Sequence, residues 1–490
     1  MNIYARFEAA FQDAADAPAL LCPGREDWTH GRLVEEVGRA ARALDARQVG
    51  VGDRVLVQIE KTPEAVALYL ACLKTGAVYV PINTAYTKPE VEYFIADCEP
   101  ALFVAGSDFD AGVPVATLDG VGGGTLLGSV SEDPVAPGSV ARADDDLAAI
   151  IYTSGTTGRA KGAMLTHANL ISNAETLCQA WGWRDDDVLL HALPIFHVHG
   201  LFVALHCAFL NATPVVFHSR FDAEAIIRDL PGSTVMMGVP TFYTRLVREP
   251  AFDAAACAHM RLFISGSAPL TEQAFAAFEE RTGFPILERY GMSETLMNTS
   301  NPLHGERVAG TVGFALPGVD VRIADPAGRP LPTGEVGSIE VRGPNVFKGY
   351  WRMPERTAEE FRGDGFFVTG DLGTMDAEGR VTIVGRDKDL VISGGYNIYP
   401  KEVETLIDEI PEVLESAVIG VPHADFGEGV VAVVVTRGQV DEERVDAHLQ
   451  GRLARYKQPK RVIRVDELPR NAMGKVQKNV LRRKYADILA

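Results

Sequence analysis

The stretch Leu147-Ala-Ala-Ile-Ile-Tyr152-Thr153-Ser-Gly-Thr-Thr-Gly-Arg-Ala-Lys161-Gly decides the fold of this 490-residue chain. Its first six residues are largely apolar and predict a buried strand. The glycines that follow let the backbone approach a ligand closely, and successive N–H groups of such a loop form a concavity that binds anions. Hydroxyl side chains and Lys161 add donors and positive charge. The sequence therefore predicts a phosphate-binding loop at the end of a strand.

The spacing within this loop differs from that of the Walker P-loop. In the Walker loop, Gly-Lys-Ser/Thr follows four free positions, whereas here Lys161 stands apart from Gly158 and is followed by glycine. A turn with only a structural role would not need four hydroxyls and a lysine at this density. We expect phosphate contacts from Thr153, Ser154, Gly155, Thr156, Thr157 and Gly158.

Strand and helix signals alternate on both sides of the loop. Strands are predicted at residues 51–60, 79–82, 101–105, 147–152, 188–193, 213–217, 234–238 and 262–265, and helices at residues 63–75 and 88–97. Such alternation is typical of parallel sheets covered by helices. The sequence therefore predicts an α/β fold.

Two later regions have different patterns. Over residues 307–385, frequent glycine and proline and short alternating runs predict antiparallel hairpins in a small barrel-like β subdomain. After Gly385-Arg-Asp-Lys388, helix and strand signals form an α+β unit of roughly 100 residues, a normal domain size. We expect a large N-terminal domain over residues 1–387 and a small α+β domain over residues 388–490.

The charge balance limits the classes of partner. The chain has 47 Lys+Arg and 66 Asp+Glu, a formal net charge of -19, which argues against binding to nucleic acids or anionic membranes. Segment 452–484 differs, because it holds twelve Lys and Arg residues against Asp466 and Glu467. That segment is predicted to be either a solvated basic face or a site for ligand phosphates.

Cysteine use and the N-terminus indicate a cytoplasmic protein. The six cysteines are scattered and form no C-x-x-C pair, which is typical of reduced thiols. The first residues lack the apolar core of a secretory signal. The most apolar stretch, residues 201–217, contains His206, Asn211 and Pro214, so it is too short and too polar to span a bilayer. The sequence does not indicate an oligomeric state.

Six further motifs follow the loop in order. They are Pro194-Ile-Phe-His-Val-His-Gly200, Glu288-Arg-Tyr-Gly-Met-Ser-Glu-Thr295, Thr369-Gly-Asp371, Gly385-Arg-Asp-Lys388, Gly394-Gly-Tyr-Asn397 and Asn471-Ala-Met-Gly-Lys475. With the loop, they resemble the adenylate-forming superfamily of acyl-CoA synthetases, adenylation domains of peptide synthetases and luciferases. The resemblance covers nearly the whole chain. It implies that a carboxylate attacks the α-phosphate of ATP and that a thiol, here of CoA, then attacks the acyl-adenylate.

The resemblance also implies roles for single residues. Glu294 is expected to bind Mg²⁺ with Thr153, Tyr290 to cover adenine, and Asp371 to bind the ribose hydroxyls. Lys475 is expected to bridge the substrate carboxylate and the α-phosphate, and Lys388 to be the hinge of a mobile C-terminal domain. The expected catalytic set is Lys475, Glu294, Lys161 and His197. Further contacts to nucleotide or CoA are expected from Ser267, Ala268, Glu288, Arg289, Gly291, Thr295, Arg386, Gly394, Gly395 and Tyr396.

Charged residues indicate which acid is activated. Many relatives have glycine where Arg289 stands, and a helix near Arg245 is expected to aim that side chain into the acyl pocket. A buried guanidinium needs a partner, and a second carboxylate on the substrate would bind it bidentately. The run from Glu288 to Ser300 resembles malonyl-CoA synthetases. We therefore expect malonate, with methylmalonate as a possible second substrate.

The expected substrate contacts are ranked. Arg245 comes first, assisted by Ser267 and His199, while Met297 either sets pocket depth or is plain packing. Two roles are possible for Arg289: it either contacts the substrate in the acyl pocket or forms a structural ion pair with Glu288 or Glu294.

Four other functions are compatible with some of these motifs. A luciferase-like oxygenase is one of them, but it would need a large apolar pocket. An acetyl-CoA or other short- or medium-chain acyl-CoA synthetase shares the same core chemistry, whereas an amino-acid adenylation domain would need an acid in the pocket. A nucleotide-binding regulator without catalysis would not need Lys161, Glu294, Asp371 and Lys475 together.

Overall fold

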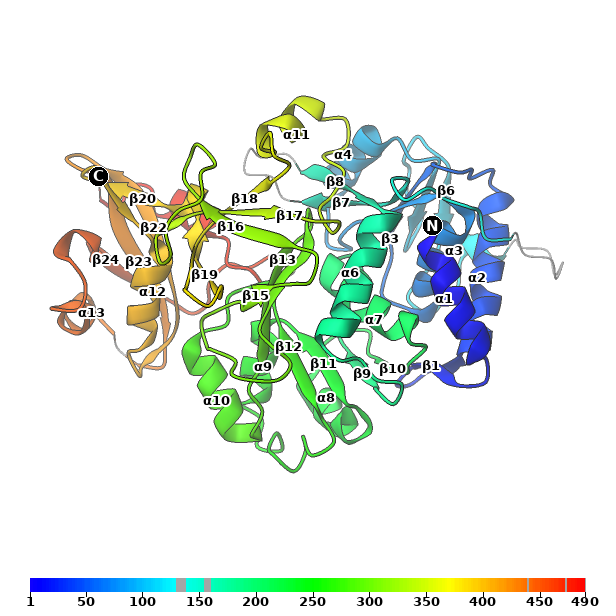
Figure 1. Cartoon of the computed structure of the whole chain (residues 1–490), viewed down its shortest axis with the longest axis horizontal. Coiled ribbons are helices and arrows are strands. Elements are labelled where there is room, and N and C mark those ends of the chain that lie inside the picture. The colour runs from blue at the N-terminus through cyan, green and yellow to red at the C-terminus, as the bar shows by residue number, and fades with distance from the viewer. Residues whose placement is uncertain (129–137, 154–159, 439, 472–473, 490) are drawn as a thin grey trace.

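Six strands form the sheet that carries the predicted phosphate loop (Figure 1). The computed structural model describes residues 1–128, 138–153, 160–438, 440–471 and 474–489. In the order β6-β5-β3-β4-β7-β8, the strands are β6 (Val115–Thr117), β5 (Leu102–Ala105), β3 (Arg54–Gln58), β4 (Val78–Pro81), β7 (Leu147–Thr153) and β8 (Lys161–Thr166). Neighbours are parallel except β7 and β8, which are antiparallel. The quoted loop therefore joins two adjacent strands.

A second sheet has nine strands, in the order β15-β14-β13-β12-β11-β9-β10-β1-β2. They are β1 (Pro18–Leu21), β2 (Trp28–Thr29), β9 (Leu189–His191), β10 (Val215–Phe217), β11 (Val235–Gly238), β12 (Leu262–Ser265), β13 (Leu287–Met292), β14 (Leu296–Ser300) and β15 (Phe314–Ala315). The six central strands, β13, β12, β11, β9, β10 and β1, are parallel to one another. At the two ends of the sheet, β2 pairs antiparallel with β1, β14 with β13, and β15 with β14. The carboxyl ends of the parallel strands meet at one edge, where ligands of such sheets bind.

Helices cover these sheets. They are α1 (Ile3–Asp13), α2 (His30–Asp45), α3 (Pro63–Thr75), α4 (Lys88–Cys98), α5 (Thr125–Gly128), α6 (His167–Ala180), α7 (Leu205–Leu210), α8 (Ala223–Asp229), α9 (Pro240–Leu246) and α10 (Glu272–Thr282), with a π-helix η1 (His199–Ala204) and a 3-10 turn η2 (Leu230–Gly232). One apolar core is continuous from the first sheet through α1, α3, α6 and α7 to the second sheet. The two sheets are therefore parts of one packed unit.

Helix α3 illustrates why local sequence sets the boundaries. The Thr62 side chain accepts a hydrogen bond from the N–H of Ala65, and Pro63 occupies the first turn, where no N–H is needed. At the other end, Gly76 caps the helix with φ at 79°, in the left-handed region that glycine favours. The helix spans the residues that the sequence predicted.

The β subdomain is a four-stranded antiparallel sheet. Its strands, in spatial order, are β16 (Asp320–Ala324), β17 (Gly337–Arg342), β18 (Phe367–Met375) and β19 (Val381–Arg386), with helix α11 (Pro354–Glu360) between β17 and β18. The hairpin pattern predicted for residues 307–385 is confirmed.

The C-terminal part has its own sheet (Figure 1). It also has its own hydrophobic cores. It contains η3 (Asp387–Asp389), β20 (Val391–Ser393), β21 (Tyr396–Ile398), α12 (Pro400–Asp408), β22 (Val413–His423), β23 (Gly427–Thr436), α13 (Glu442–Leu449), η4 (Arg455–Lys457), β24 (Arg461–Val465) and α14 (Lys478–Lys484). Alternate residues of β22 and β23 pack on opposite faces of this sheet, one face under α12 and α13 and the other under α14. The boundary predicted at residue 388 falls within η3 and stays a prediction.

The α/β class with a separate C-terminal domain, predicted from the sequence, is confirmed. Among the described residues, no helix is both long and apolar enough to cross a membrane.

Candidate active site

The predicted site residues come from four parts of the fold. The ends of β7 and β8 supply Thr153 and Lys161, and the β13–β14 hairpin supplies residues 288–297. Strands β18 and β19 carry Asp371 and Arg386, and the loop before α14 carries Lys475. Lys475 interacts electrostatically with Asp371, Glu294, Arg386 and Arg289, so segments far apart in the chain meet at one place.

Tyr290, Asp371 and Arg386 form the part that we call the nucleotide side. The Tyr290 hydroxyl donates to Oδ2 of Asp371 at 2.5 Å, and Nε of Arg386 lies 2.6 Å from Oδ1 of the same carboxylate. Asp371 and Tyr290 are both buried. Burial, with the nearby Asp371 charge, raises the pKa of Tyr290, and the same charge raises the pKa of Arg386. The predicted ribose and adenine residues are therefore held together before any nucleotide binds.

Glu294 lies at the same end of the site and is buried. Its Oε1 accepts hydrogen bonds from the Thr153 hydroxyl at 3.3 Å and the Tyr350 hydroxyl at 3.1 Å. Lys161 forms an ion pair with Glu360 at 3.0 Å, and its ammonium lies 3.9 Å from the centre of the Tyr350 ring. The structure thus brings Thr153, Lys161 and Glu294 together.

Tyr350 and Glu360 were not predicted as site residues. The single proton of the Tyr350 hydroxyl is shared between Glu360 at 2.7 Å and Glu294 at 3.1 Å, so Tyr350 connects the predicted lysine to the predicted metal ligand. The only sequence signal was an aromatic pair, Tyr350-Trp351, after a glycine. Such a pair is more often core than site, which is why it was missed.

Lys475 is held by a tight turn. Gly474 has φ at 72°, its N–H donates to the Asn471 carbonyl, and Nη1 of Arg470 donates to the Gly474 carbonyl at 2.5 Å. Gly474 packs on Thr241 of α9, in the N-terminal domain. The Lys475 side chain is exposed, and desolvation by the surrounding protein, followed by the Arg386 charge, lowers its pKa to about 8. The lysine predicted to bridge carboxylate and phosphate therefore lies among the groups of the nucleotide side.

His199, Ser267 and Arg289 form the part that we call the acyl side. Nδ1 of His199 lies 3.1 Å from the Ser267 hydroxyl, and its Nε2 has no hydrogen-bond partner among the described residues. Ser267 has φ at 71°, a strained conformation for a non-glycine residue and one that often marks a functional site. Burial lowers the pKa of His199 well below its usual value, so this imidazole is neutral.

Arg289 is the most unusual group on the acyl side. It is 3% exposed, and its Nε and Nη2 have no partner within the described part of the chain. Among the described residues, Arg289 forms no ion pair with Glu288 or Glu294. The alternative role of Arg289, a structural ion pair with one of these acids, is therefore not observed. A Cβ on Gly266 would lie 2.4 Å from the guanidinium carbon, which means that only glycine leaves room for it. Burial lowers the pKa of Arg289 to about 10.

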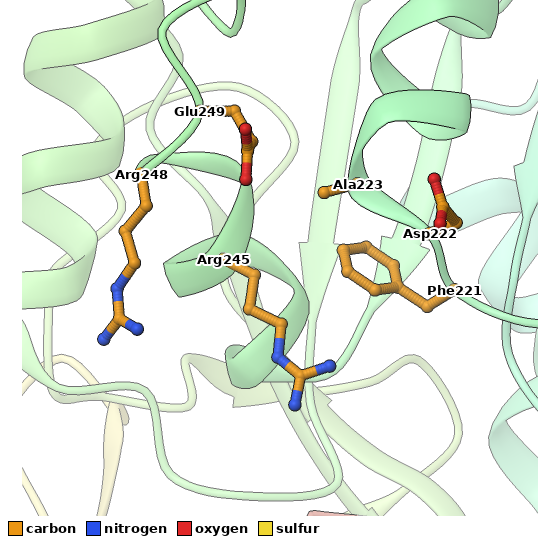
Figure 2. A pocket seen from close by; sticks show the side chains of 6 residues that line it. All are labelled: Phe221, Asp222, Ala223, Arg245, Arg248 and Glu249. Atoms are coloured by element: carbon orange, nitrogen blue, oxygen red, sulfur yellow. The ribbon is translucent and has the colours of Figure 1, made fainter.

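Arg245, the substrate residue ranked first from the sequence, lies on α9 and is exposed, while the helix buries its Tyr243 and Leu246 face. It lines a surface pocket of about 370 Å³ with Phe221, Asp222 and Arg248. Figure 2 shows its guanidinium pointing away from Arg248 and Glu249. The orientation toward the acid and the role in binding that the sequence predicts for Arg245 both stay predictions.

The remaining predicted residues of the hairpin are buried or close to the site. Glu288 accepts a hydrogen bond from the N–H of Leu270, its Oε2 has no partner among the described residues, and burial raises its pKa to about 8. A Cβ on Gly291 would clash with the Leu296 carbonyl, and Met297 is buried beside it. Thr295 is buried with an unpaired hydroxyl in the described structure, and Ala268 lies in the segment after Ser267.

His197 is partly buried, and burial, followed by the charge of Lys475, lowers its pKa to about 3. It is therefore a neutral group near Lys475. The predicted hinge and tunnel residues, Lys388, Gly394, Gly395 and Tyr396, are all exposed. The loop residues Ser154, Gly155, Thr156, Thr157 and Gly158 lie outside the described residues.

Half of the twelve basic residues in segment 452–484 form ion pairs within their own domain. Arg452, Lys457, Arg461, Arg470, Lys478 and Arg482 all form ion pairs with acids of the C-terminal part. Much of the predicted positive face is thus neutralised locally, and binding of CoA phosphates there stays a prediction.

Two family models match the chain. The model for the AMP-binding enzyme matches residues 7–351, and that for the AMP-binding enzyme C-terminal domain matches residues 402–475. The structure of ATP-bound MatB from Rhodopseudomonas palustris is 52% identical, has a TM-score of 0.96 and covers 100% of both chains.

Curated relatives of known activity span nearly the full chain. Feruloyl-CoA synthase from Amycolatopsis sp is 36% identical over 93% of this chain and 94% of its own length. Malonate–CoA ligase from Arabidopsis thaliana is 34% identical over 97% of this chain and 88% of its own length. The chain therefore belongs to the AMP-binding enzyme family, as one of its acid–CoA ligases that use ATP and CoA.

Proposed function

We propose that the acid is malonate, with methylmalonate as a second substrate, and that the products are malonyl-CoA, AMP and pyrophosphate. The observation that carries the proposal is the buried guanidinium of Arg289, whose Nε and Nη2 are unpaired among the described residues. Leaving a buried charge without a partner costs several kcal/mol. A second carboxylate on the acid would offset that cost.

The geometry of the acyl side fits a small dianion. A guanidinium binds a carboxylate through two parallel hydrogen bonds. His199 is neutral, and if the Ser267 hydroxyl donates to its Nδ1, its Nε2 carries the proton and offers one more donor. Ferulate, an aromatic monoacid, would leave these donors unpaired, so the buried polar groups favour malonate over the acid of the feruloyl-CoA synthase relative.

The first half-reaction joins two anions. One malonate carboxylate oxygen forms a bond to the α-phosphorus of ATP, and the bond from that phosphorus to the bridging oxygen breaks, so that pyrophosphate leaves. Positive charge aimed at the developing negative charge is the main source of acceleration in such a step. Lys475, placed among Asp371, Glu294 and Arg289, is proposed to supply it.

Magnesium fits the carboxylate at the nucleotide side. Mg²⁺ is usually held by one or two carboxylates together with substrate phosphates, and Glu294 is a single buried carboxylate with Thr153 beside it. Among the described residues, no cluster of three or more His, Cys, Asp or Glu side chains could hold a metal alone. We propose that Glu294 and Thr153 hold Mg²⁺ with the ATP phosphates, where it would neutralise phosphate charge.

The second half-reaction needs a different arrangement. The CoA sulfur forms a bond to the acyl carbon, the bond from that carbon to the AMP oxygen breaks, and the thiol proton passes to solvent. Lys475 has no role in that step. We propose that the domain after Lys388 rotates so that Gly394, Gly395 and Tyr396, which are exposed here, line the path of the CoA thiol.

ATP–pyrophosphate exchange with a panel of acids tests the proposal. We expect exchange with malonate, weaker exchange with methylmalonate, and little with acetate, succinate, glycine or ferulate. Exchange with acetate as strong as with malonate would overturn the dicarboxylate proposal in favour of a short-chain synthetase. No exchange with any acid would point to a nucleotide-binding regulator.

A further inference from the structure

Lys61 is a buried lysine outside the motifs described above. Its side chain is 8% exposed, and no carboxylate lies within ion-pair distance of it in the described part of the chain. Instead, Nζ lies 2.7 Å from Nδ1 and 3.0 Å from the carbonyl oxygen of His191, and 4.4 Å from the centre of the Phe217 ring. Burial lowers the pKa of Lys61 well below its usual value. Such a group is costly to bury, so a function for it is expected.

Hydrogen bonds pass from Lys61 to the acyl side through His191. Because Lys61 donates to Nδ1, the proton of the neutral His191 ring lies on Nε2, which donates to the Gly200 carbonyl at 2.9 Å. The ring also stacks on Phe217, with 5.8 Å between ring centres. Both hydrogen bonds and the stacking fix the imidazole in one orientation.

The Gly200 carbonyl belongs to the segment that carries His199. Residues from His199 to Ala204 form a π-helix, a rare form that frequently marks functional sites. A Cβ on Gly200 would lie 2.2 Å from the Pro194 carbonyl, so the segment is tightly folded. The bond from His191 to the carbonyl next to His199 therefore restrains the residue whose Nδ1 meets Ser267.

We infer that Lys61 is a positioning residue for substrate binding: through His191 and the Gly200 carbonyl it holds His199 in the orientation that receives the distal carboxylate. The inference rests on the proposed function, because His199 is assigned there to the acyl side. Lys61 itself touches neither acid nor nucleotide.

The matched control is Lys74. Lys74 is 7% exposed, and its ammonium lies 5.0 Å from the centre of the Tyr4 ring. The two lysines flank the same helix: Lys74 lies in the last turn of α3, and Lys61 lies just before its first turn. Unlike Lys61, it pairs with a carboxylate, Glu8, at 2.6 Å. Lys74→Met and Lys61→Met thus each remove one buried lysine amine that lies near an aromatic ring and at an end of α3.

The test is steady-state ATP–pyrophosphate exchange by the full chain. We expect Lys61→Met to raise KM for malonate by about tenfold while KM for ATP changes less than about twofold. Lys74→Met should change neither KM by more than about twofold. The double variant Lys61→Met/His199→Ala should be no worse for malonate than His199→Ala alone, because both changes remove one interaction. His191→Phe, which keeps the stack on Phe217, should reproduce Lys61→Met, and it serves as the variant if Lys61→Met does not fold.

Three results would overturn the inference: an unchanged KM for malonate in Lys61→Met, an equal rise in KM for ATP, or losses that add in the double variant. Failure of the proposed function looks different, because the wild-type chain would then show no malonate exchange. In that case, the KM values of wild type, Lys61→Met and Lys74→Met would be compared for the acid that does support exchange, and a rise in Lys61→Met alone would still show that Lys61 positions the acyl side.

Discussion

On the nucleotide side of the site, the buried carboxylates are paired with neighbouring groups. Asp371 is bonded to both Tyr290 and Arg386, and Glu294 accepts from Thr153 and Tyr350. On the acyl side, Nε and Nη2 of Arg289 and Nε2 of His199 have no partner among the described residues. The same protein therefore contains one region that is electrostatically complete and one that is not.

The difference indicates what each region recognises. A pre-paired carboxylate keeps its geometry without ligand and can exchange one partner for the ribose hydroxyls. An unpaired buried guanidinium instead discriminates by charge, because an acid without a second anion leaves it unsatisfied. We therefore expect selectivity for the acid to arise on the acyl side and the shared chemistry on the nucleotide side.

Removing Lys475, which lies near both sides, should have the largest effect. Lys475→Ala should lower malonate-dependent ATP–pyrophosphate exchange by ~10³-fold, because it removes the charge next to the reacting phosphate. The same variant should convert supplied malonyl-adenylate and CoA to thioester within about threefold of wild type. Lys484→Ala, an exposed lysine of α14, is the control. Equal loss in both half-reactions would contradict the domain-rotation proposal.

The two arginines separate a buried contact from an exposed one. Arg289→Leu should lower kcat/KM for malonate by ~10²-fold, equivalent to ~2.7 kcal/mol, with KM for ATP unchanged. Arg245→Leu should lower it by less than about tenfold, because exposed charges contribute little. If Arg245→Leu loses as much as Arg289→Leu, Arg245 turns inward on binding and the sequence-based ranking is restored.

The pH dependence of adenylation should report Lys475. Its pKa is lowered to about 8 in the free protein, and the protonated form is the one that stabilises negative charge. As the pH rises through 8, the protonated form is lost, so kcat/KM for exchange should decrease. Well above pH 8 the decrease should approach about tenfold for each pH unit. Stopped assays between pH 6.5 and 9.5 measure this. A profile that stays flat to pH 9.5 would show that the lysine remains charged or is not required.

Glu288→Gln should have the smallest effect on activity. Burial raises the pKa of Glu288 to about 8, so the side chain is mostly neutral at pH 7 and glutamine resembles it. We expect exchange within about threefold of wild type at pH 7, whereas an ionised Glu288 that binds a cation would give a larger loss.

The same pKa predicts a pH effect on stability. Because the folded state holds the Glu288 proton more tightly than the unfolded chain, whose carboxyl has a pKa near 4.5, its stabilising contribution is complete below that value and is lost as pH rises toward 8. Thermal unfolding between pH 5 and 8.5 should therefore show a smaller decline in Tm for Glu288→Gln than for wild type. Parallel declines would contradict an unusual pKa.

Local patterns made much of the fold predictable. Helix α3 carries its own start and stop signals in Thr62, Pro63 and Gly76, and the apolar run of β7 must be buried in any fold. Roles for motif residues such as Tyr290 and Asp371 could be predicted only through the family resemblance of the motifs that contain them.

Other parts of the site depend on contacts that the sequence does not encode locally. Whether α9 buries Arg245 or Tyr243 is decided by packing on β11 and α10, and the helix buries Tyr243. Tyr350 reaches Glu294 from 56 residues away, and Gly266 matters only because the Arg289 guanidinium lies against it. No spacing rule links these pairs.

The central claim is that Arg289 pairs with the distal carboxylate of the acid. It is tested most directly by comparing kcat/KM for malonate with that for malonamate, its neutral amide isostere, in wild type and in Arg289→Leu. We predict a wild-type preference for malonate of ~10²-fold or more that falls to about threefold or less in the variant. A preference that survives the substitution would contradict the account, because the charge would then be read by another group.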